Sequence, residues 1–85
     1  MSRHDKLLVR FRSRPKDFTF AELRTLLRGL GYTELTGGRT GGSRVAFHNA
    51  DRRHIIRLHR PHPAKVLKRY QVEEVLAELA RVGAI

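Results

Sequence analysis

The chain has 85 residues, which is enough for one small domain and too few to enclose a second hydrophobic core. It contains no cysteine, so disulfide bonds, a thiolate nucleophile and cysteine-ligated zinc are excluded, and the fold must rest on the hydrophobic 40% of the residues. No apolar run approaches the roughly 20 residues of a membrane span or the roughly 7 to 15 of a signal-peptide centre. We therefore expect a cytoplasmic protein that makes no use of a membrane.

Positive charge dominates the sequence and is concentrated in its middle. Eighteen Lys and Arg residues against eight Asp and Glu give a net charge of +10. Residues 37–69 hold nine bases and one acid, a net charge of +8, whereas the segments 17–36 and 70–85 are slightly acidic. Such clustering is typical of a surface that binds phosphate groups, and the simpler alternative is a solvated surface that keeps the protein soluble. A polyanion or an acidic protein is the expected partner.

Two helices are predicted before this basic region. The spacing of apolar residues over 4–13 predicts a short amphipathic helix that packs one face onto the core. A second helix should run over 20–30, because Thr19 and Glu22 form a capping box at its start. Gly31 can take the left-handed conformation that ends a helix. The buried stripe of this helix consists of leucines at helical spacing, Leu23, Leu26, Leu27 and Leu30.

Three strands follow, over residues 32–36, 43–49 and 53–59. In the last two strands apolar residues alternate with Arg and His, so one face of the sheet is expected to be apolar and the other cationic. The segment between the first two strands has four glycines in six positions, which is typical of a connecting loop.

A two-residue turn at positions 50–51 is predicted to close the hairpin between the second and third strands. In that register Val45 lies opposite Ile56 on the apolar face. On the outer face Arg44 lies beside Arg57, an unfavourable contact between two guanidinium groups unless an anion screens them. The hairpin therefore predicts a phosphate site.

The last predicted element is a helix over 70–82, which ends at Gly83. Three basic residues, Lys65, Lys68 and Arg69, lead into it. The order helix, helix, strand, strand, strand, helix indicates an α+β domain, in which helices cover the apolar face of a three-stranded antiparallel sheet.

Several short motifs, in this order along the chain, resemble those of HicA-type toxins. They are Leu30-Gly31-Tyr32, Gly42-Ser43, the apolar hairpin, Leu58-His59-Arg60-Pro61-His62-Pro63 and Leu67-Lys68-Arg69-Tyr70-Gln71-Val72. The resemblance covers about residues 17–82. It implies a fold similar to a double-stranded RNA-binding domain, an endoribonuclease activity that cleaves mRNA and inhibits translation, and a HicB-type antitoxin that neutralises it. Residues 1–16 are then a helical extension of a HicA-like domain at 17–85.

The sequence departs from this family at one position that matters for chemistry. In the family a strand opens with Gly-Ser-His, whose histidine acts in RNA cleavage, whereas here Gly42 and Ser43 are followed by Arg44. Arginine, with a pKa above about 12, cannot take the proton of a 2′-hydroxyl, but it can bind a phosphate and stabilise charge on phosphorus. For metal-independent cleavage, His48 and His59 on the same predicted face are the candidates for proton transfer. The alternative is that both are exposed histidines without a chemical role.

Other basic residues complete the expected RNA site. Arg57 shares the cationic face, Arg39 lies in the glycine-rich loop, and the cations before the last helix lie where its N-terminal amides also attract phosphate. The predicted RNA-binding residues are Arg39, Gly42, Ser43, Arg44, Arg57, Lys65, Lys68 and Arg69. No metal and no small-molecule cofactor is expected, because the histidines lack a coordinating set and the glycine-rich loop lacks the ending of a nucleotide-binding loop. His54 alternates with Ile56 and Leu58, and we expect it to be partly buried and structural.

Two functions from different classes fit these features. The first is a metal-independent endoribonuclease, the toxin of a toxin–antitoxin pair, whose basic sheet face is shared by RNA and an acidic antitoxin. The second is a catalytically impaired module that kept RNA or partner binding and lost the proton-transfer residue at Arg44. A DNA-binding protein is disfavoured, because the second and third predicted helices carry too much acid to lie in a major groove.

Overall fold

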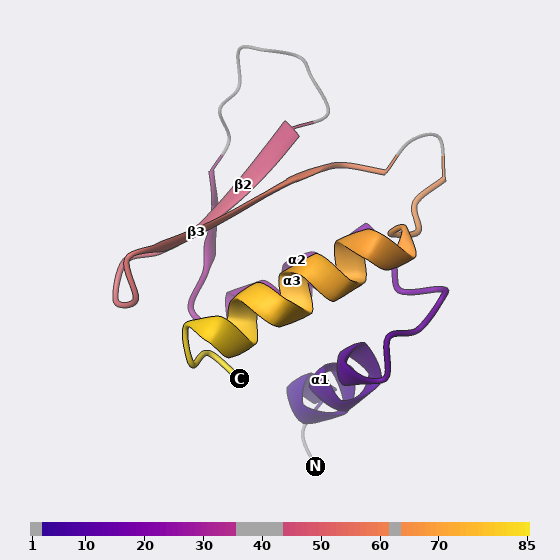
Figure 1. The fold of residues 1–85 in the computed structure, drawn as a ribbon, viewed down its shortest axis with the longest axis horizontal. Helices are drawn as coiled ribbons and strands as arrows, with labels where there is room; N and C mark the ends of the chain where they lie inside the picture. The colour runs from indigo at the N-terminus through magenta and orange to yellow at the C-terminus, as the bar shows by residue number, and fades with distance from the viewer. Residues whose placement is uncertain (1–2, 36–43, 62–63) are drawn as a thin grey trace.

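The computed structural model describes residues 3–35, 44–61 and 64–85. They form an α+β fold in which helices cover one face of a three-stranded antiparallel sheet (Figure 1). The elements in chain order are α1 (Arg3–Arg12), α2 (Phe20–Gly29), β1 (Thr33–Leu35), β2 (Arg44–Asn49), β3 (His54–His59) and α3 (Arg69–Arg81). The predicted fold class and order of elements are confirmed, and they agree with a fold similar to a double-stranded RNA-binding domain.

The elements are arranged in successive layers. α2 packs against β1 and α3 packs against β3, while α1 packs against these two helices on the side away from the sheet (Figure 1). The largest fully buried side chains come from all the layers and are Phe11, Phe18, Phe47, Leu23, Leu26, Leu27, Leu79 and Val72. The ring of Phe11 lies 4.9 Å from that of Phe18, measured between centroids. α1 is therefore part of the hydrophobic core, in which each buried side chain of this size contributes about 1.5–3 kcal/mol.

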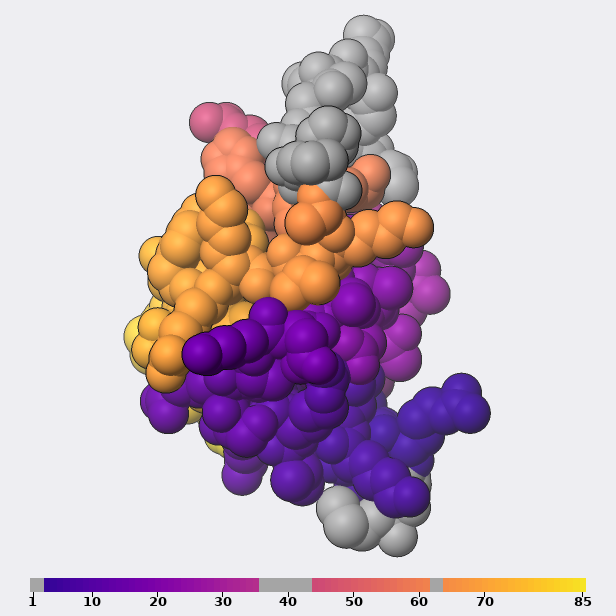
Figure 2. All heavy atoms as spheres, turned by 90° about the vertical axis from the view of Figure 1, so that its right-hand side faces the viewer, coloured from indigo at the N-terminus to yellow at the C-terminus, as the bar shows by residue number. Residues whose placement is uncertain are grey.

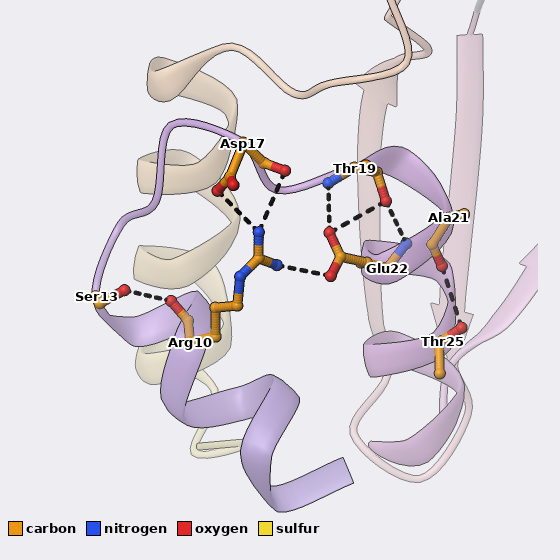
Figure 3. Close-up of polar contacts among 7 residues, drawn as sticks. All are labelled: Arg10, Ser13, Asp17, Thr19, Ala21, Glu22 and Thr25. Atoms are coloured by element: carbon orange, nitrogen blue, oxygen red, sulfur yellow. Dashed lines mark hydrogen bonds and ion pairs between the residues drawn. The ribbon is translucent and has the colours of Figure 1, made fainter. Parts of the chain in front are cut away.

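Both ends of α2 are formed by the residues that predicted them. The Thr19 hydroxyl accepts the Glu22 N–H at 3.1 Å, and the Glu22 carboxylate accepts the Thr19 N–H at 2.9 Å (Figure 3). At the other end Gly31 has φ +95°. The Tyr32 N–H donates to the Leu27 carbonyl across this glycine at 2.9 Å, which is the bond of a Schellman motif. Local hydrogen bonding thus sets where the helix begins and ends.

The two faces of the sheet differ as the alternation predicted. Val45, Phe47 and Ile56 are buried beneath the helices, whereas Arg44 and Arg57 are exposed on the outer face. The sheet order is β1-β2-β3, so β2 is the central strand. The expectation of one apolar and one cationic face is confirmed.

The predicted register of the hairpin is wrong by two residues. The expected pairs, Val45 with Ile56 and Arg44 with Arg57, are not formed. The observed pairs are Arg44 with His59, Val45 with Leu58, Ala46 with Arg57, Phe47 with Ile56, His48 with Ile55 and Asn49 with His54.

The cause of this difference is the turn, which takes four residues, 50–53, instead of two. The Asn49 carboxamide oxygen accepts the Arg52 N–H at 3.1 Å, and Arg53, the residue before β3, has φ +50°. Because side chains alternate along a strand with a period of two, an even shift of register leaves every side chain on its predicted face. Only the cross-strand neighbours change.

Candidate nucleic-acid interface

One end of the outer face of the sheet brings three of the predicted site residues together. Arg44 begins β2, Arg57 and His59 lie in β3, and all three side chains are exposed. Among the described residues, neither Arg44 nor Arg57 takes part in an ion pair. Two guanidinium groups without a carboxylate partner on one surface favour the binding of an anion.

Arg44 and His59 are direct cross-strand neighbours. Side chains in such a pair have their Cβ atoms about 5 Å apart. Arg57 lies two residues before His59 on the same face, about 7 Å along the strand. The register therefore groups one imidazole with two guanidinium groups. This combination can hold a phosphate while a neighbouring side chain moves a proton.

An open hollow of about 640 Å³ lies among these side chains. Its lining consists of the three polar residues and four aliphatic ones, Leu35, Val45, Ala46 and Leu58. A nucleotide has the same dual character, since its phosphate is anionic and its sugar and base present apolar surfaces. The hollow is thus suited to one or a few nucleotides of a single strand.

A buried glutamine links this surface to α3. Gln71 is 5% exposed, and its Nε2 donates to the main-chain carbonyl of His59 at 2.8 Å. Its Oε1 accepts the Lys68 N–H at 3.0 Å. The role of Gln71 was not predicted. Its bond to Lys68 could have been, because a Gln three residues after the N-cap often accepts the N–H of the cap residue. The bond to His59 joins distant segments and leaves no local pattern.

The predicted cations before α3 lie together at its start. Lys68 is the N-cap, Arg69 is the first helical residue, and both are exposed. The Lys65 carbonyl accepts the Phe20 N–H at 2.9 Å, which holds this segment against the start of α2. Figure 2 shows the segment 64–69, in orange, on the molecular surface. Its charges thus face solvent on a segment whose main chain is held in place.

The remaining predicted site residues lie farther along this face or outside the described residues. His48 is half-buried in β2 opposite Ile55, four residues or about 13 Å from Arg44. The structure does not bring it to the pair formed by Arg44 and His59. Three further predicted residues, Arg39, Gly42 and Ser43, lie outside the described residues.

His54 belongs to a separate hydrogen-bonded chain on the inner side of the sheet. Its Nδ1 lies 2.6 Å from the Tyr32 hydroxyl, and its Nε2 lies 2.9 Å from the Glu78 carboxylate, which also accepts two bonds from Arg81. Hydrogen bonds from Arg81 and then from His54 lower the pKa of Glu78 to about 2. Burial raises the pKa of Tyr32. The predicted burial of His54 is confirmed, and its partners tie β3 to α3.

Metal-binding and membrane-spanning features were sought in the same parts of the chain. Within residues 3–35, 44–61 and 64–85, no three His, Asp or Glu side chains are grouped so that they could hold a metal ion. No helix in these ranges is both long enough and apolar enough to cross a membrane.

One family of proteins matches the chain. The family model described as the HicA toxin of bacterial toxin–antitoxin matches residues 20–80. This range contains α2, the whole sheet and all but the last residue of α3, whereas α1 precedes it. The chain has no match among curated proteins and none among solved structures. Because the family match covers well over half of the 85 residues, the chain belongs to the HicA toxin family of bacterial toxin–antitoxin systems.

Proposed function

We propose that this toxin is a metal-independent endoribonuclease that cleaves mRNA on the outer face of its sheet, and that a HicB-type antitoxin silences it by covering that face. The observation that carries the proposal is the cross-strand pair of Arg44 and His59 in an open hollow. The pair supplies an anion-binding guanidinium group and an imidazole that can act as a general base, within one side-chain length of each other.

In this proposal His59 accepts the proton of a ribose 2′-hydroxyl. The 2′-oxygen then attacks the adjacent phosphorus, and the bond from phosphorus to the 5′-oxygen of the next nucleotide breaks. The departing 5′-oxygen takes a proton from water and His59 returns its proton to the solvent, so the products are a 2′,3′-cyclic phosphate and a free 5′-hydroxyl. Arg44 binds the non-bridging oxygens and stabilises the negative charge that builds up on the phosphorane, and Arg57 adds a second contact.

Of the two histidines predicted as candidates, we assign the proton transfer to His59. His59 lies opposite the phosphate-binding arginine, whereas His48 lies about 13 Å along the strand, beyond the reach of the same phosphodiester. The chemical role of both histidines is tested by the same set of variants.

A second candidate function is favoured by one observation, the arginine at the position where the family has its histidine. Arg44 cannot exchange a proton at neutral pH. If no other group takes over, the same surface binds RNA or the antitoxin without cleaving, as a catalytically impaired module.

The sheet face also suits the antitoxin. Leu35 is 45% exposed and Ile55 is 36% exposed, and both lie on the outer face beside the cations. An acidic protein with a few apolar side chains would find complementary charge and apolar contact there. Addition of the antitoxin is expected to release bound RNA, and a stable complex of toxin, RNA and antitoxin would contradict a shared face.

Cleavage of single-stranded RNA in the presence of EDTA tests the enzyme proposal, with a 2′-deoxy substrate as the control. We expect the parent to cut only the RNA, and His59→Ala to slow cutting by about 100 to 10,000 fold. His48→Ala is the matched control on the same face and should cut as the parent does. Binding of RNA without cutting would select the impaired module, and full activity of His59→Ala would remove that residue from the mechanism.

Binding is tested separately from cleavage. Arg44→Ala and Arg57→Ala are each expected to flatten the dependence of log affinity on log salt by about 0.7, the slope for one lost contact to a single-stranded phosphate. An unchanged slope would exclude the residue from the RNA interface.

A further inference from the structure

The loop between α1 and α2 has a fixed course. Phe11, at the end of α1, is completely buried against Phe18. The Arg10 guanidinium reaches across the loop, with its Nη2 2.8 Å from the Asp17 carboxylate and its Nη1 2.6 Å from that of Glu22 (Figure 3). The hydrogen bond from Arg10 to Glu22 also raises the pKa of this arginine. The main chain of residues 13–17 is therefore held in place, and its side chains project from a fixed position.

This loop runs beside the segment that leads into α3. The Leu67 N–H donates to the Phe18 carbonyl at 2.9 Å, and Thr19 and Val66 form an antiparallel bridge. These contacts hold Phe18, at the end of the loop, against the segment that leads into α3.

A side-chain contact also joins this loop to α3. Arg14 Nε lies 4.0 Å from a carboxylate oxygen of Glu73, one turn into α3. Figure 2 shows the residues between α1 and α2, in purple, directly beside the orange segment 64–69 on one face of the molecule. Two stretches that are about fifty residues apart in the sequence thus form one surface.

This surface is strongly cationic. We define the basic strip by its exposed cations, which are Arg12, Arg14, Lys16, Lys65, Lys68 and Arg69. Residues 12–17 and 64–69 together hold these six bases and one acid, a net charge of +5. That acid, Asp17, is already bound by Arg10. The contact between Arg14 and Glu73 is long, and both side chains are half exposed, so it contributes little and leaves Arg14 available to a ligand.

We propose that the basic strip is a second RNA site, in which Arg14 and Lys16 bind the phosphodiester backbone of a single strand whose scissile segment lies at Arg44 and His59. The proposal rests on the proposed function. It gives the N-terminal helix, which precedes the range matched by the family, a role in holding substrate.

The two sites are joined in the structure. Gln71 bonds to the His59 carbonyl on one side and to the Lys68 N–H on the other, so the catalytic end of β3 adjoins the start of the strip. An RNA strand that leaves the hollow can therefore pass over Lys68 and then along the loop cations. Tyr70, 52% exposed, lies next to them and offers a ring on which a base can stack.

Single-stranded RNA fits the strip better than an acidic protein does. Three other large hydrophobic side chains are exposed in the described residues, and two of them, Leu35 and Ile55, lie on the sheet face. The third, Val9, lies on α1. The strip has cations and one aromatic ring but no apolar patch, which is the pattern of a surface that follows a nucleic-acid backbone.

The test compares Arg14→Ala/Lys16→Ala with a matched control, Lys6→Ala/Arg28→Ala. Both double variants remove two exposed cations, and the control cations lie in the first half of α1 and in the last turn of α2. The probes are 2′-O-methyl RNA strands of about 4 and about 16 nucleotides, the range of lengths that one small single-strand-binding domain covers. These strands bind but lack the hydroxyl needed for cleavage.

For the longer strand we expect the slope of log affinity against log salt to become less steep by about 1.4 in Arg14→Ala/Lys16→Ala. The slope should stay at the parental value in the control. The short strand, bound at the hollow, should not distinguish the variants. Arg14→Lys/Lys16→Arg should restore the parental slope, and equal melting temperatures would show that the fold is intact.

Equal slopes for the two alanine double variants would overturn the second site while the proposed function stands. Loss of affinity for the antitoxin alone would overturn it in favour of a protein surface. If the parent binds neither strand, the proposed function fails, and the strip proposal fails with it.

Discussion

The main-chain carbonyl of His59 accepts a hydrogen bond from the buried side chain of Gln71 at 2.8 Å, which fixes the end of β3 against the first turn of α3. The same amide accepts the Lys68 N–H, so one side chain connects the proposed proton-transfer residue with the cations before α3.

Two replacements of Gln71 test the contributions of these two hydrogen bonds. Gln71→Glu keeps an acceptor for the Lys68 N–H but places a carboxylate against the His59 carbonyl, whereas Gln71→Leu removes both bonds. Each variant leaves buried polar groups without partners, and we expect a loss of about 1–3 kcal/mol in the free energy of unfolding, measured in urea. Parental stability in both would show that water replaces the amide at no cost.

A second prediction concerns acid and the Glu22 carboxylate. Burial alone would raise the pKa of Glu22, but hydrogen bonds from the Thr19 N–H and from Arg10 outweigh it and lower the pKa below the 4.5 of an unstructured chain. Its contribution to stability is therefore complete above about pH 4.5 and is lost as the pH falls through the lower folded-state pKa.

Glu22→Gln should cost roughly 0.5–1 kcal/mol near pH 7, the size of a partly exposed ion pair, and this difference from the parent should become smaller at a pH below 4.5. Urea unfolding at both pH values measures it. Glu74→Gln, at an exposed position in α3, is the control and should follow the parent at both. A difference that does not depend on pH would assign the effect to the cap rather than to the charge.

A third prediction tests whether α1 belongs to the core. Phe11→Ala should cost about 3–5 kcal/mol, because the ring is completely buried and its removal leaves a cavity. Val9→Ala on the same helix, where the side chain is 57% exposed, should change the stability by less than about 0.5 kcal/mol. Thermal unfolding of the two variants compares them, and similar melting temperatures would mean that α1 is dispensable for the fold.

A fourth prediction uses the two tyrosines. Tyr32→Phe deprives the buried His54 of the hydroxyl that lies 2.6 Å from its Nδ1, and should cost about 1–3 kcal/mol. Tyr70→Phe, at a half-exposed ring, should lie within about 0.5 kcal/mol of the parent. Denaturant titration of both proteins decides, and a neutral Tyr32→Phe would show that the His54 chain adds nothing to stability.

The features that could be predicted from sequence are those set by local hydrogen bonding and by periodicity. The limits of α2 follow from nearby residues. Thr19 and Glu22 bond to main-chain groups at its start, and the positive φ of Gly31 ends it. The alternation of Val45 and Phe47 with polar residues likewise predicts which face of the sheet is buried. These signals act over a few residues and do not depend on the rest of the fold.

The register of the hairpin could not be derived in the same way. Residues 50–53 contain no glycine, yet Arg53 adopts a positive φ, and the Asn49 side chain stabilises the longer turn. An Asn before a turn does indicate such bonding, but it does not give the loop length. The bonds of Gln71 to His59 and of His54 to Glu78 join distant segments, so only the assembled fold reveals them.

The turn at 50–53 has a consequence for how this surface can evolve. If a change in the length of this turn shifts the pairing by two residues, Arg44 gains a new neighbour across the strands while no aliphatic side chain leaves the interior. The residue paired with Arg44, which in the proposed function is the proton-transfer residue, can thus be exchanged by a change in a solvent-exposed loop. A shift of the pairing by one residue would instead turn the charged surface of one strand inward.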